Sequence, residues 1–352
     1  MPKSILIIKP SALGDIALAL GALSSLRASF PEAKISWFVR REFAALIEHN
    51  PNLDEVIIFE RKFLGKWWYD PKAFGALVTL IRRLYTGRFD IVFDLQGLFR
   101  TALFGWFSGS KKRFGMSTAR ECATLLYTDK IRCDADKVHL IDYYQKMFSA
   151  AGARVQSTEL EPAISAEADE SVQKLLRSSG VSVHGYAVLV PGAAHQYKCW
   201  PVEKFALLSE KIVSEYGLDI IAVGTAGEKN IIEKLRSLSD VGVIDFSGRT
   251  NISELIALLK SAKLVVSNDT GPGHIAAAMR VPLVMIFGAT NPARVGPYKK
   301  PDAVAAVDPF DRGQAIESDD PAHQIGEVTL EMVFEKVKCQ LAQGTEKTDV
   351  QN

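Results

Sequence analysis

A loop at residues 267–274 carries the residue types best suited to binding an anion. It reads Ser-Asn-Asp-Thr-Gly-Pro-Gly-His, follows a short apolar run and precedes a pattern typical of a helix. Asp269 or Thr270 can cap that helix, and Pro272 suits its first turn. Free amides and the helix dipole at such a start attract a diphosphate. His274 would then contact phosphate or ribose, whereas a well-capped helix without a ligand is the alternative interpretation.

The glycines of this loop, Gly271 and Gly273, let a ligand approach the backbone closely. Together with Ala276 they match G-x-G-x-x-A, the dinucleotide fingerprint. That fingerprint also needs an acidic residue about 20 positions further on, after the next strand. The next apolar run ends in Phe-Gly-Ala-Thr-Asn at residues 287–291, which contains no carboxylate. A dehydrogenase that binds NAD is therefore disfavoured.

A second loop of the same kind, at residues 191–201, lies between another predicted strand and helix. Its Lys198 is a mobile cation that can neutralise the charge developing on a leaving diphosphate. Ala193 and Ala194 can offer only backbone amides to a phosphate. A surface lysine in front of a Trp-Pro helix start is the alternative. The chain contains no G-x-x-x-x-G-K-[ST] pattern, which excludes a P-loop nucleotide hydrolase.

Asp15 is the candidate general base. It ends a turn at residues 9–15, where a predicted strand leads into a predicted helix. A carboxylate at such a place can accept the proton of an attacking hydroxyl group. Taken alone, an acidic residue at this position is more commonly a helix cap. The catalytic interpretation therefore depends on the other motifs of the chain.

The charge of the 352-residue chain is balanced overall but uneven along its length. There are 42 Lys and Arg against 41 Asp and Glu, so we expect no nucleic-acid partner, because such proteins usually have a clear basic excess. Residues 1–160 contain 23 Lys and Arg against 16 Asp and Glu, whereas residues 161–352 contain 19 against 25. A basic half beside an acidic half suggests that the first half meets an anion.

The positive charge of the first half gathers in two stretches. Residues 97–119 contain no acidic residue, and the basic residues there and at the next position are Arg100, Lys111, Lys112, Arg113 and Arg120. Upstream, residues 61–69 mix the cations Arg61, Lys62 and Lys66 with aromatic side chains. Such cations suit phosphate or carboxylate groups on an acceptor, and the aromatic residues suit a lipid headgroup boundary. An ordinary solvated basic face is the alternative.

The elements that must position these residues form an alternating series. Short β-branched runs alternate with amphipathic stretches, which is typical of parallel sheets covered by helices on both faces. Strands are predicted at residues 5–8, 34–39, 55–59, 91–94, 186–190, 219–223, 242–245, 264–267 and 283–287. Helices are predicted at residues 15–29, 43–48, 73–85, 140–150, 202–215, 227–238, 252–261, 274–279 and 328–341.

The length fits two domains of about 150 residues each. We predict a boundary in the polar stretch 155–185, between Rossmann-like domains at 1–165 and 180–326. A C-terminal helix at 327–345 is a candidate to pack back on the N-terminal domain. Ligands of such folds bind at the carboxyl ends of the strands, which is where the loops described above lie.

Cysteine usage and hydropathy bear on the compartment. The four cysteines are widely spaced without a CxxC pair, which indicates a reducing compartment and no structural zinc site. No stretch approaches about 18 unbroken apolar residues, so no membrane span is predicted. We therefore expect a cytoplasmic protein that can still touch a membrane surface.

Five motifs occur in order: Lys9-x-Ser11-x-x-Gly14-Asp15, Asp94-x-Gln96-Gly97-Leu98, Thr118-Ala119-Arg120-Glu121, Lys198-x-Trp200-Pro201 and Asp269-Thr270-Gly271-x-x-His274. Over about residues 3–300 this combination resembles the lipopolysaccharide heptosyltransferases, glycosyltransferase family 9. The middle motifs and His139 look more like heptosyltransferase I, which adds the first heptose, than the enzyme that adds the second. The resemblance implies a GT-B fold, with two Rossmann-like domains facing each other across a cleft.

The resemblance also implies a reaction, the inverting transfer of L-glycero-D-manno-heptose from ADP-heptose to the Kdo residue of Kdo-lipid A. Asp15 would be the general base. The C-terminal domain would hold the nucleotide sugar, through Lys198, Glu228 near the ribose, and the loop residues Asp269, Thr270, Gly271, Gly273 and His274. The N-terminal domain would bind the acceptor, through Ser11, Gly14, Arg61, Lys62, Lys66, Gln96 and Arg120.

The implied partners are ADP-heptose, Kdo-lipid A and the cytoplasmic face of the inner membrane. We expect no metal or other cofactor, since Lys198 and the helix terminus can neutralise the leaving group. One departure is that Ala193 and Ala194 stand where some family members carry hydroxyl residues. The alternatives are heptosyltransferase II, another GT-B nucleotide-sugar transferase or epimerase, and, from a different class, a non-catalytic sugar-phosphate binding protein.

Overall fold

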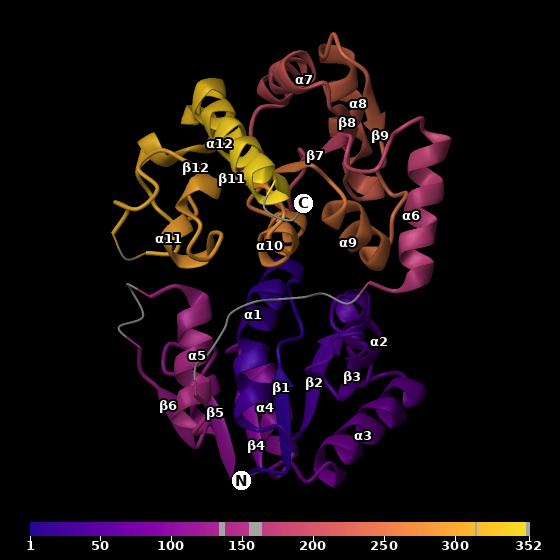
Figure 1. Ribbon diagram of the computed structural model, residues 1–352. Helices are drawn as coiled ribbons and strands as arrows, with labels where there is room; N and C mark the ends of the chain where they lie inside the picture. Colours follow the sequence, from indigo (N-terminus) through magenta and orange to yellow (C-terminus); the bar gives the residue numbers. More distant parts are fainter. Residues whose placement is uncertain (134–137, 155–163, 314, 350–352) are drawn as a thin grey trace. The chain divides into compact units, whose positions relative to one another are not determined.

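The computed structural model describes residues 1–133, 138–154, 164–313 and 315–349 (Figure 1). The chain divides into two compact units, Met1–Ala163 and Ile164–Asn352, and each contains its own sheet. Within the described residues, no helix has the length and apolar character needed to cross a membrane.

Six parallel strands form the sheet of the first unit, in the order β3-β2-β1-β4-β5-β6. They are β1 (Ser4–Ile8), β2 (Lys34–Arg40), β3 (Glu55–Phe59), β4 (Ile91–Asp94), β5 (Lys112–Met116) and β6 (Asp129–Ile131). The central strand β1 is fully buried from Ile5 to Ile8, which explains why its sequence is an unbroken apolar run. The order is that of the Rossmann fold, in which the winding direction reverses between β1 and β4.

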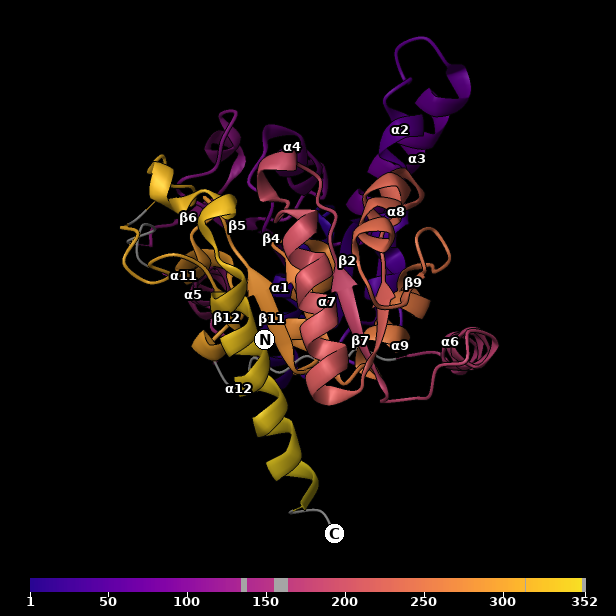
Figure 2. The same ribbon diagram turned by 90° about the horizontal axis from the view of Figure 1, so that it is seen from above.

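Among the described residues of this unit, five α-helices accompany the sheet: α1 (Leu13–Ser29), α2 (Arg61–Leu64), α3 (Pro71–Thr86), α4 (Phe99–Phe107) and α5 (Leu140–Ala150). The same residues form the 3₁₀ turns η1 (Arg41–Leu46) and η2 (Ala123–Leu126). α1 packs against α5, whereas α3 packs between α2 and α4 (Figures 1 and 2). Helices therefore cover the sheet in two groups.

The second unit repeats the architecture with the order β12-β11-β10-β7-β8-β9, again all parallel. Its strands are β7 (Tyr186–Val190), β8 (Asp219–Ala222), β9 (Val243–Asp245), β10 (Leu264–Asn268), β11 (Leu283–Ile286) and β12 (Val304–Ala305). Because β7 is the first strand of this unit, the winding direction reverses between β7 and β10.

The α-helices of the second unit are α6 (Ala166–Ser178), α7 (Val202–Tyr216), α8 (Lys229–Leu238), α9 (Ile252–Lys260), α10 (Gly271–Ala278), α11 (Pro292–Val295) and α12 (Leu330–Asp349). Its 3₁₀ turns are η3 (Gln196–Lys198), η4 (Ala226–Glu228), η5 (Pro301–Ala303), η6 (Pro321–His323) and η7 (Ile325–Glu327). α12 packs against β11 and α7 of its own unit.

The two Rossmann-like sheets confirm the predicted α/β fold class. Each predicted strand and helix has a counterpart, although residues 41–46 form a 3₁₀ turn rather than an α-helix and α12 continues to Asp349. The prediction missed β5, because its sequence Lys-Arg-Phe-Gly-Met offers no apolar run, and the short strands β6 and β12. It did not include the helices α2, α4 and α11. It also missed α6, which lies in the stretch 155–185 predicted as a boundary; residues 155–163 of that stretch lie outside the described residues.

Candidate active site

Lys198, Asp269 and His274 are brought together at the carboxyl edge of the second sheet. Lys198 ends η3 after β7, Asp269 follows β10, and His274 lies in the first turn of α10. Lys198 Nζ donates to Asp269 Oδ2 at 2.6 Å, and His274 Nε2 lies 3.1 Å from Asp269 Oδ1. Since β7 and β10 flank the reversal of strand order, this cluster lies where Rossmann folds bind ligands.

Asp269 is buried in an ionised state. Burial alone would raise its pKa, but the hydrogen bond and charge of His274, together with Lys198, hold the pKa of Asp269 well below its usual range. An ionised carboxylate only accepts hydrogen bonds, so His274 Nε2 is the donor. His274 Nδ1 is buried and has no hydrogen-bond partner among the described residues. That nitrogen is therefore an unpaired polar atom in the interior of the cluster.

α10 begins without a side-chain cap. Its N-cap is Thr270, but Thr270 Oγ1 pairs with Ser267 Oγ at 3.0 Å, and within the described residues it forms no cap bond to the first helix amides. Thr270 thus takes the predicted N-cap position without forming a side-chain cap bond, and the Asp269 carboxylate is engaged by the cluster described above. Pro272 does occupy the first turn, as predicted. The amides that start with Gly271 stay available to an anion.

Asn268 fixes the loop that carries Lys198. Its Nδ2 donates to the Pro191 carbonyl at 2.8 Å, and its Oδ1 accepts from the Trp200 amide at 3.1 Å. One fully buried side chain therefore bridges both ends of the loop after β7. No role was predicted for Asn268; the available signal was a polar amide directly after a buried strand.

Glu228 lies against the start of the same loop. Its Oε2 accepts from the amide and the hydroxyl of Thr225, at 2.7 and 2.8 Å. A Cβ at Gly192 would come within 2.2 Å of Glu228 Oε1, so a larger residue there would require the Glu228 side chain to move. The structure thus places Glu228 beside the backbone that leads to Ala193 and Ala194, at the edge shared by β7 and β8.

Gly273 allows α10 to approach the sheet. A Cβ at this position would meet Ser267 Oγ at 2.8 Å and Met285 Cε at 3.0 Å. The second glycine of the loop is therefore explained by close packing of α10 on β10 and β11 as well as by ligand approach.

In the first unit, Asp15 lies in the first turn of α1, directly after β1. Asp15 Oδ2 accepts a hydrogen bond from Lys9 Nζ at 3.1 Å and a longer one, at 3.4 Å, from the Ala12 amide. The Lys9 side chain is buried, whereas that of Asp15 is 42% exposed. The carboxylate is thus anchored through one oxygen, and its other oxygen has no partner among the described residues. Lys9 stood in a motif without a predicted role.

Gln96 and Arg120 lie beside each other at the carboxyl end of β4. Asp94, the last residue of β4, accepts hydrogen bonds from the amides of Gln96 and Gly97 and from two hydroxyl groups. Burial raises the pKa of Asp94, although these hydrogen bonds oppose the rise. The Arg120 amide donates to the Gly97 carbonyl at 2.9 Å. Gln96 Oε1 is buried and has no hydrogen-bond partner within the described ranges.

The predicted acceptor cations Arg61, Lys62 and Lys66 are exposed on α2 and the turn after it, beyond the carboxyl end of β3. The structure adds Arg40, the last residue of β2. Partial burial, followed by the nearby charges of Arg61 and Arg100, lowers the pKa of Arg40. Arg40 Nε is buried without a hydrogen-bond partner in the described part of the chain.

Ser11 and Gly14 lie between β1 and α1, in the same loop as Asp15. The Arg40 amide donates to the Pro10 carbonyl at 3.3 Å, so this loop also contacts the end of β2. The predicted site residues of each unit thus follow the carboxyl ends of its strands. Among the residues that the structure describes, no three His, Cys, Asp or Glu side chains gather in a group that could hold a metal ion.

The sequence of residues 77–322 matches glycosyltransferase family 9 (heptosyltransferase). The chain belongs to this family. This family 9 enzyme is 25% identical over 310 residues to the lipopolysaccharide core heptosyltransferase OpsX of Haemophilus influenzae. The matched region is 87% of this chain and 85% of the relative. It is 27% identical over 302 residues to lipopolysaccharide heptosyltransferase 1 of Salmonella typhimurium, and this match covers 84% of this chain and 92% of the relative.

The fold of this family 9 enzyme is similar to that of the heptosyltransferase WaaC of E. coli, whose structure was determined with ADP. The TM-score is 0.74 at 24% identity, over 96% of this chain and 99% of that chain. The likeness confirms the predicted GT-B type of two Rossmann-like units, and family membership confirms the predicted glycosyltransferase class.

Proposed function

We propose that this family 9 enzyme transfers L-glycero-D-manno-heptose from ADP-heptose to the Kdo residue of Kdo-lipid A in lipopolysaccharide inner-core biosynthesis. The observation that carries the proposal is the cluster of Lys198, Asp269 and His274 at the start of α10. A cation and uncapped helix amides meet there, which suits the diphosphate of a sugar nucleotide. The ADP in the WaaC structure and the names of the relatives support the choice of donor.

In this proposal the second unit holds the donor. Lys198 and the α10 amides bind the diphosphate, and Glu228 lies near the ribose, beside the close-packed Gly192. The ammonium and the helix terminus oppose the negative charge that develops as ADP leaves. No step then needs a metal ion, and transfer is expected to continue in excess chelator.

Asp15 of the first unit acts as the general base. The acceptor hydroxyl loses its proton to the Asp15 carboxylate and attacks the anomeric carbon of the heptose. A bond forms between that carbon and the acceptor oxygen while the bond to the diphosphate oxygen breaks, so the configuration inverts. The buried Lys9 holds one Asp15 oxygen, which leaves the second to receive the proton.

The cations around the first sheet's carboxyl edge suit the anionic acceptor. Arg40, Arg61 and Arg100 are close enough for their charges to interact, although mutual repulsion opposes such a cluster. An acceptor with carboxylate and phosphate groups would relieve that repulsion by pairing with these guanidinium groups. Gln96 and Arg120 extend this surface along the end of β4.

Transfer of the first heptose is proposed over transfer of the second because the motifs around Gln96, Arg120 and His139 resemble heptosyltransferase I more closely. His139 itself caps α5, where its Nδ1 accepts from the Ile141 amide at 3.2 Å. Its role in this proposal is to hold α5 in place. The acceptor is lipid-linked, so the reaction would take place at the cytoplasmic face of the inner membrane.

The test has two stages and uses the full chain in EDTA. Calorimetric titration with ADP, UDP and NAD should detect binding of ADP in preference to the other two; a preference for UDP would assign a different sugar donor. Mass spectrometry should then detect one heptose added from ADP-heptose to Kdo-lipid A. Product from an acceptor that already carries one heptose, without product from Kdo-lipid A, would assign the second transfer instead.

A further inference from the structure

α3 of the first unit has two apolar faces, of which the fold uses one. Ala73, Leu80 and Leu84 are buried against the sheet. Phe74, Val78, Ile81 and Tyr85 follow the spacing i, i+4, i+7 and i+11, so they form a second stripe along the helix. Phe74 is 52% exposed, Val78 48% and Tyr85 67%, whereas Ile81 is half-buried. From Phe74 to Tyr85 the stripe is about 17 Å long.

Aromatic side chains continue the exposed apolar surface beyond the start of α3. Trp67, Trp68 and Tyr69 directly precede the helix, and Trp68 is 72% exposed. The rings of Trp68 and Tyr69 meet edge to face, with centroids 4.6 Å apart. This segment lies after the carboxyl end of β3, on the same sheet edge as Asp15. We call the stripe and this segment together the α3 surface.

The charges along this part of the chain are almost all positive. Residues 61–89 contain seven Lys and Arg and one acidic residue, Asp70, which is occupied as the N-cap of α3. Arg83 pairs with Glu55. In the described part of the chain the other six cations form no ion pair; they are Arg61, Lys62, Lys66, Lys72, Arg82 and Arg88.

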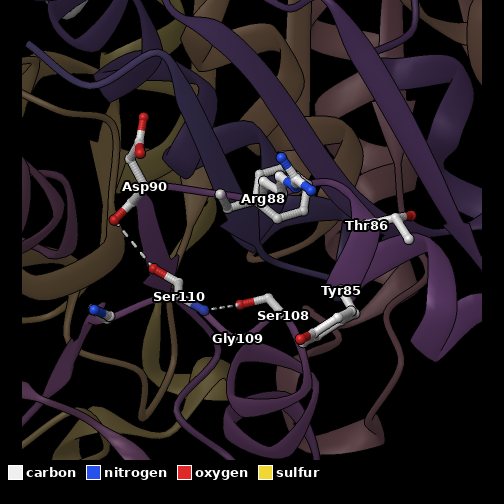
Figure 3. A pocket seen from close by; sticks show the side chains of 9 residues that line it. Tyr85, Thr86, Arg88, Asp90, Ser108, Gly109 and Ser110 are labelled. Carbon is white, nitrogen blue, oxygen red and sulfur yellow. Dashed lines mark hydrogen bonds between the residues drawn. The ribbon is translucent and has the colours of Figure 1, made fainter.

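A polar hollow lies at the other end of the stripe. Tyr85 lines a cavity of about 650 Å³ together with Arg88, Asp90, Ser110 and Lys111 (Figure 3). The Asp90 carboxylate accepts hydrogen bonds from the amides of Lys3 and Ser4, and Ser110 Oγ donates to the Asp90 carbonyl. The two basic side chains have no ion-pair partner in the described ranges. Positive charge therefore accompanies the apolar stripe to its end.

We propose that the α3 surface docks the enzyme on a bilayer that contains anionic lipid. Exposed aromatic and aliphatic side chains enter the headgroup boundary, and the flanking cations contact lipid phosphates. Tryptophan and tyrosine suit this boundary because each combines an apolar body with a polar atom. The occupant is a membrane because exposed aromatic side chains are flanked by cations that form no ion pair in the described part of the chain, and anionic headgroups complement that charge. The purpose of docking rests on the proposed function, in which the acceptor is embedded in lipid.

The test is co-sedimentation of the full chain with vesicles of phosphatidylcholine, with and without phosphatidylglycerol. The chain should bind the anionic vesicles, and added salt should weaken the binding. The double variant Phe74→Ser, Val78→Ser should lower the partition coefficient by at least about tenfold. The matched control is Phe310→Ser, Val183→Ser, since these residues of the second unit are 55% and 48% exposed. It should bind like the unmodified chain.

Three results would overturn the proposal: no binding of the unmodified chain to anionic vesicles, equal binding of the two double variants, or a dimer in solution that only the α3 variant dissociates. The last would make the α3 surface an interface between copies. Transfer to a deacylated, water-soluble acceptor separates this proposal from the proposed function. The α3 variant should still transfer heptose to this soluble acceptor. If the unmodified chain cannot transfer heptose to it, the proposed function is contradicted, whereas the vesicle-binding result still stands.

Discussion

Lys198 Nζ lies 2.6 Å from Asp269 Oδ2, although 71 residues separate the two in the sequence. The ion pair joins the loop after β7 to the loop after β10, the two strands that flank the reversal in the second sheet. An ammonium group has three donors, so the bond to Asp269 orients Lys198 and leaves donors for a ligand. Asp269 is held in turn by His274, which makes the cation one member of a fixed network.

Replacing Lys198 with methionine should lower kcat/KM for ADP-heptose by about 10²- to 10³-fold, because the charge opposing the leaving diphosphate is removed. ADP affinity should fall as well, since the same cation meets the ground-state diphosphate. Steady-state kinetics and calorimetry measure the two effects. The control is Lys234→Met, which removes an exposed lysine paired with Glu203 in the same unit. Equal activity of the two variants would show that Lys198 has only a structural bond to Asp269.

Replacing Asn268 with leucine should lower the free energy of unfolding by about 1–3 kcal/mol, because the buried Trp200 amide and Pro191 carbonyl both lose their partner. The loop that carries Lys198 should lose its anchor, so donor affinity should fall together with the melting temperature. Thermal unfolding and ADP titration measure these changes. Asn230→Leu, on the exposed surface of α8, is the control and should change neither. An unchanged melting temperature of the Asn268 variant would contradict the anchoring role.

How much of the fold could be predicted depends on how each strand is buried. Strands buried on both faces, such as Ile5–Ile8 in β1, appear in the sequence as unbroken apolar runs and were found. β5 was missed because it carries Lys112 and Arg113 and is held by contacts outside the strand. The Arg113 amide donates to Thr128 Oγ1, for example. Such bonds are fixed by tertiary structure and leave no local pattern.

The positions of the candidate site were predictable because Rossmann folds place their functional loops after the strands. The partners within each loop were not. Asp269 was expected to cap a helix, yet it binds Lys198, whose loop lies 71 residues away in the sequence. Asn268 and Arg40 escaped notice for the same reason, since their roles come from a neighbouring strand's loop. Spacing predicts which loops meet, but not which side chains pair.

Acid should destabilise the first unit partly through Glu55. Burial favours a higher pKa, but hydrogen bonds with Lys34, Arg83 and Ser36 outweigh it and lower the pKa of Glu55 to about 2 from an ordinary value of 4.5. Because the folded pKa is the lower one, ionised Glu55 stabilises the fold above pH 4.5, and this contribution is lost as the pH falls toward 2.

Glu55→Gln should therefore lower the free energy of unfolding at neutral pH, and its difference from the unmodified chain should shrink with falling pH. Denaturant titrations across that range measure it. Glu170→Gln is the control, because Glu170 forms an exposed pair with Lys174 within one helix. A Glu55 effect that does not change with pH would contradict the role of its ionisation.

Arg40→Gln should raise KM for Kdo-lipid A by about tenfold and leave ADP affinity unchanged, because a charged hydrogen bond to an anionic acceptor is lost. The substitution also removes repulsion from Arg61 and Arg100, so the melting temperature should not fall. Kinetics at saturating donor measure the change in KM. Arg132→Gln, at an exposed position of the same unit, should leave KM as it is. A fall in stability with unchanged KM would assign Arg40 to the fold alone.

Asp15→Asn should lower kcat by about 10²- to 10⁴-fold, because an amide cannot accept the proton of the acceptor hydroxyl. The amide oxygen can still accept hydrogen bonds from Lys9 and Ala12, so the loop should keep its structure. ADP affinity should also be kept, since the proposed donor site lies in the second unit. Asp320→Asn is the matched control, because Asp320 caps a turn through the Ala322 amide and asparagine caps equally well. Parallel losses of kcat, ADP affinity and melting temperature in the Asp15 variant would identify a structural carboxylate, whereas loss of kcat alone assigns Asp15 the proton.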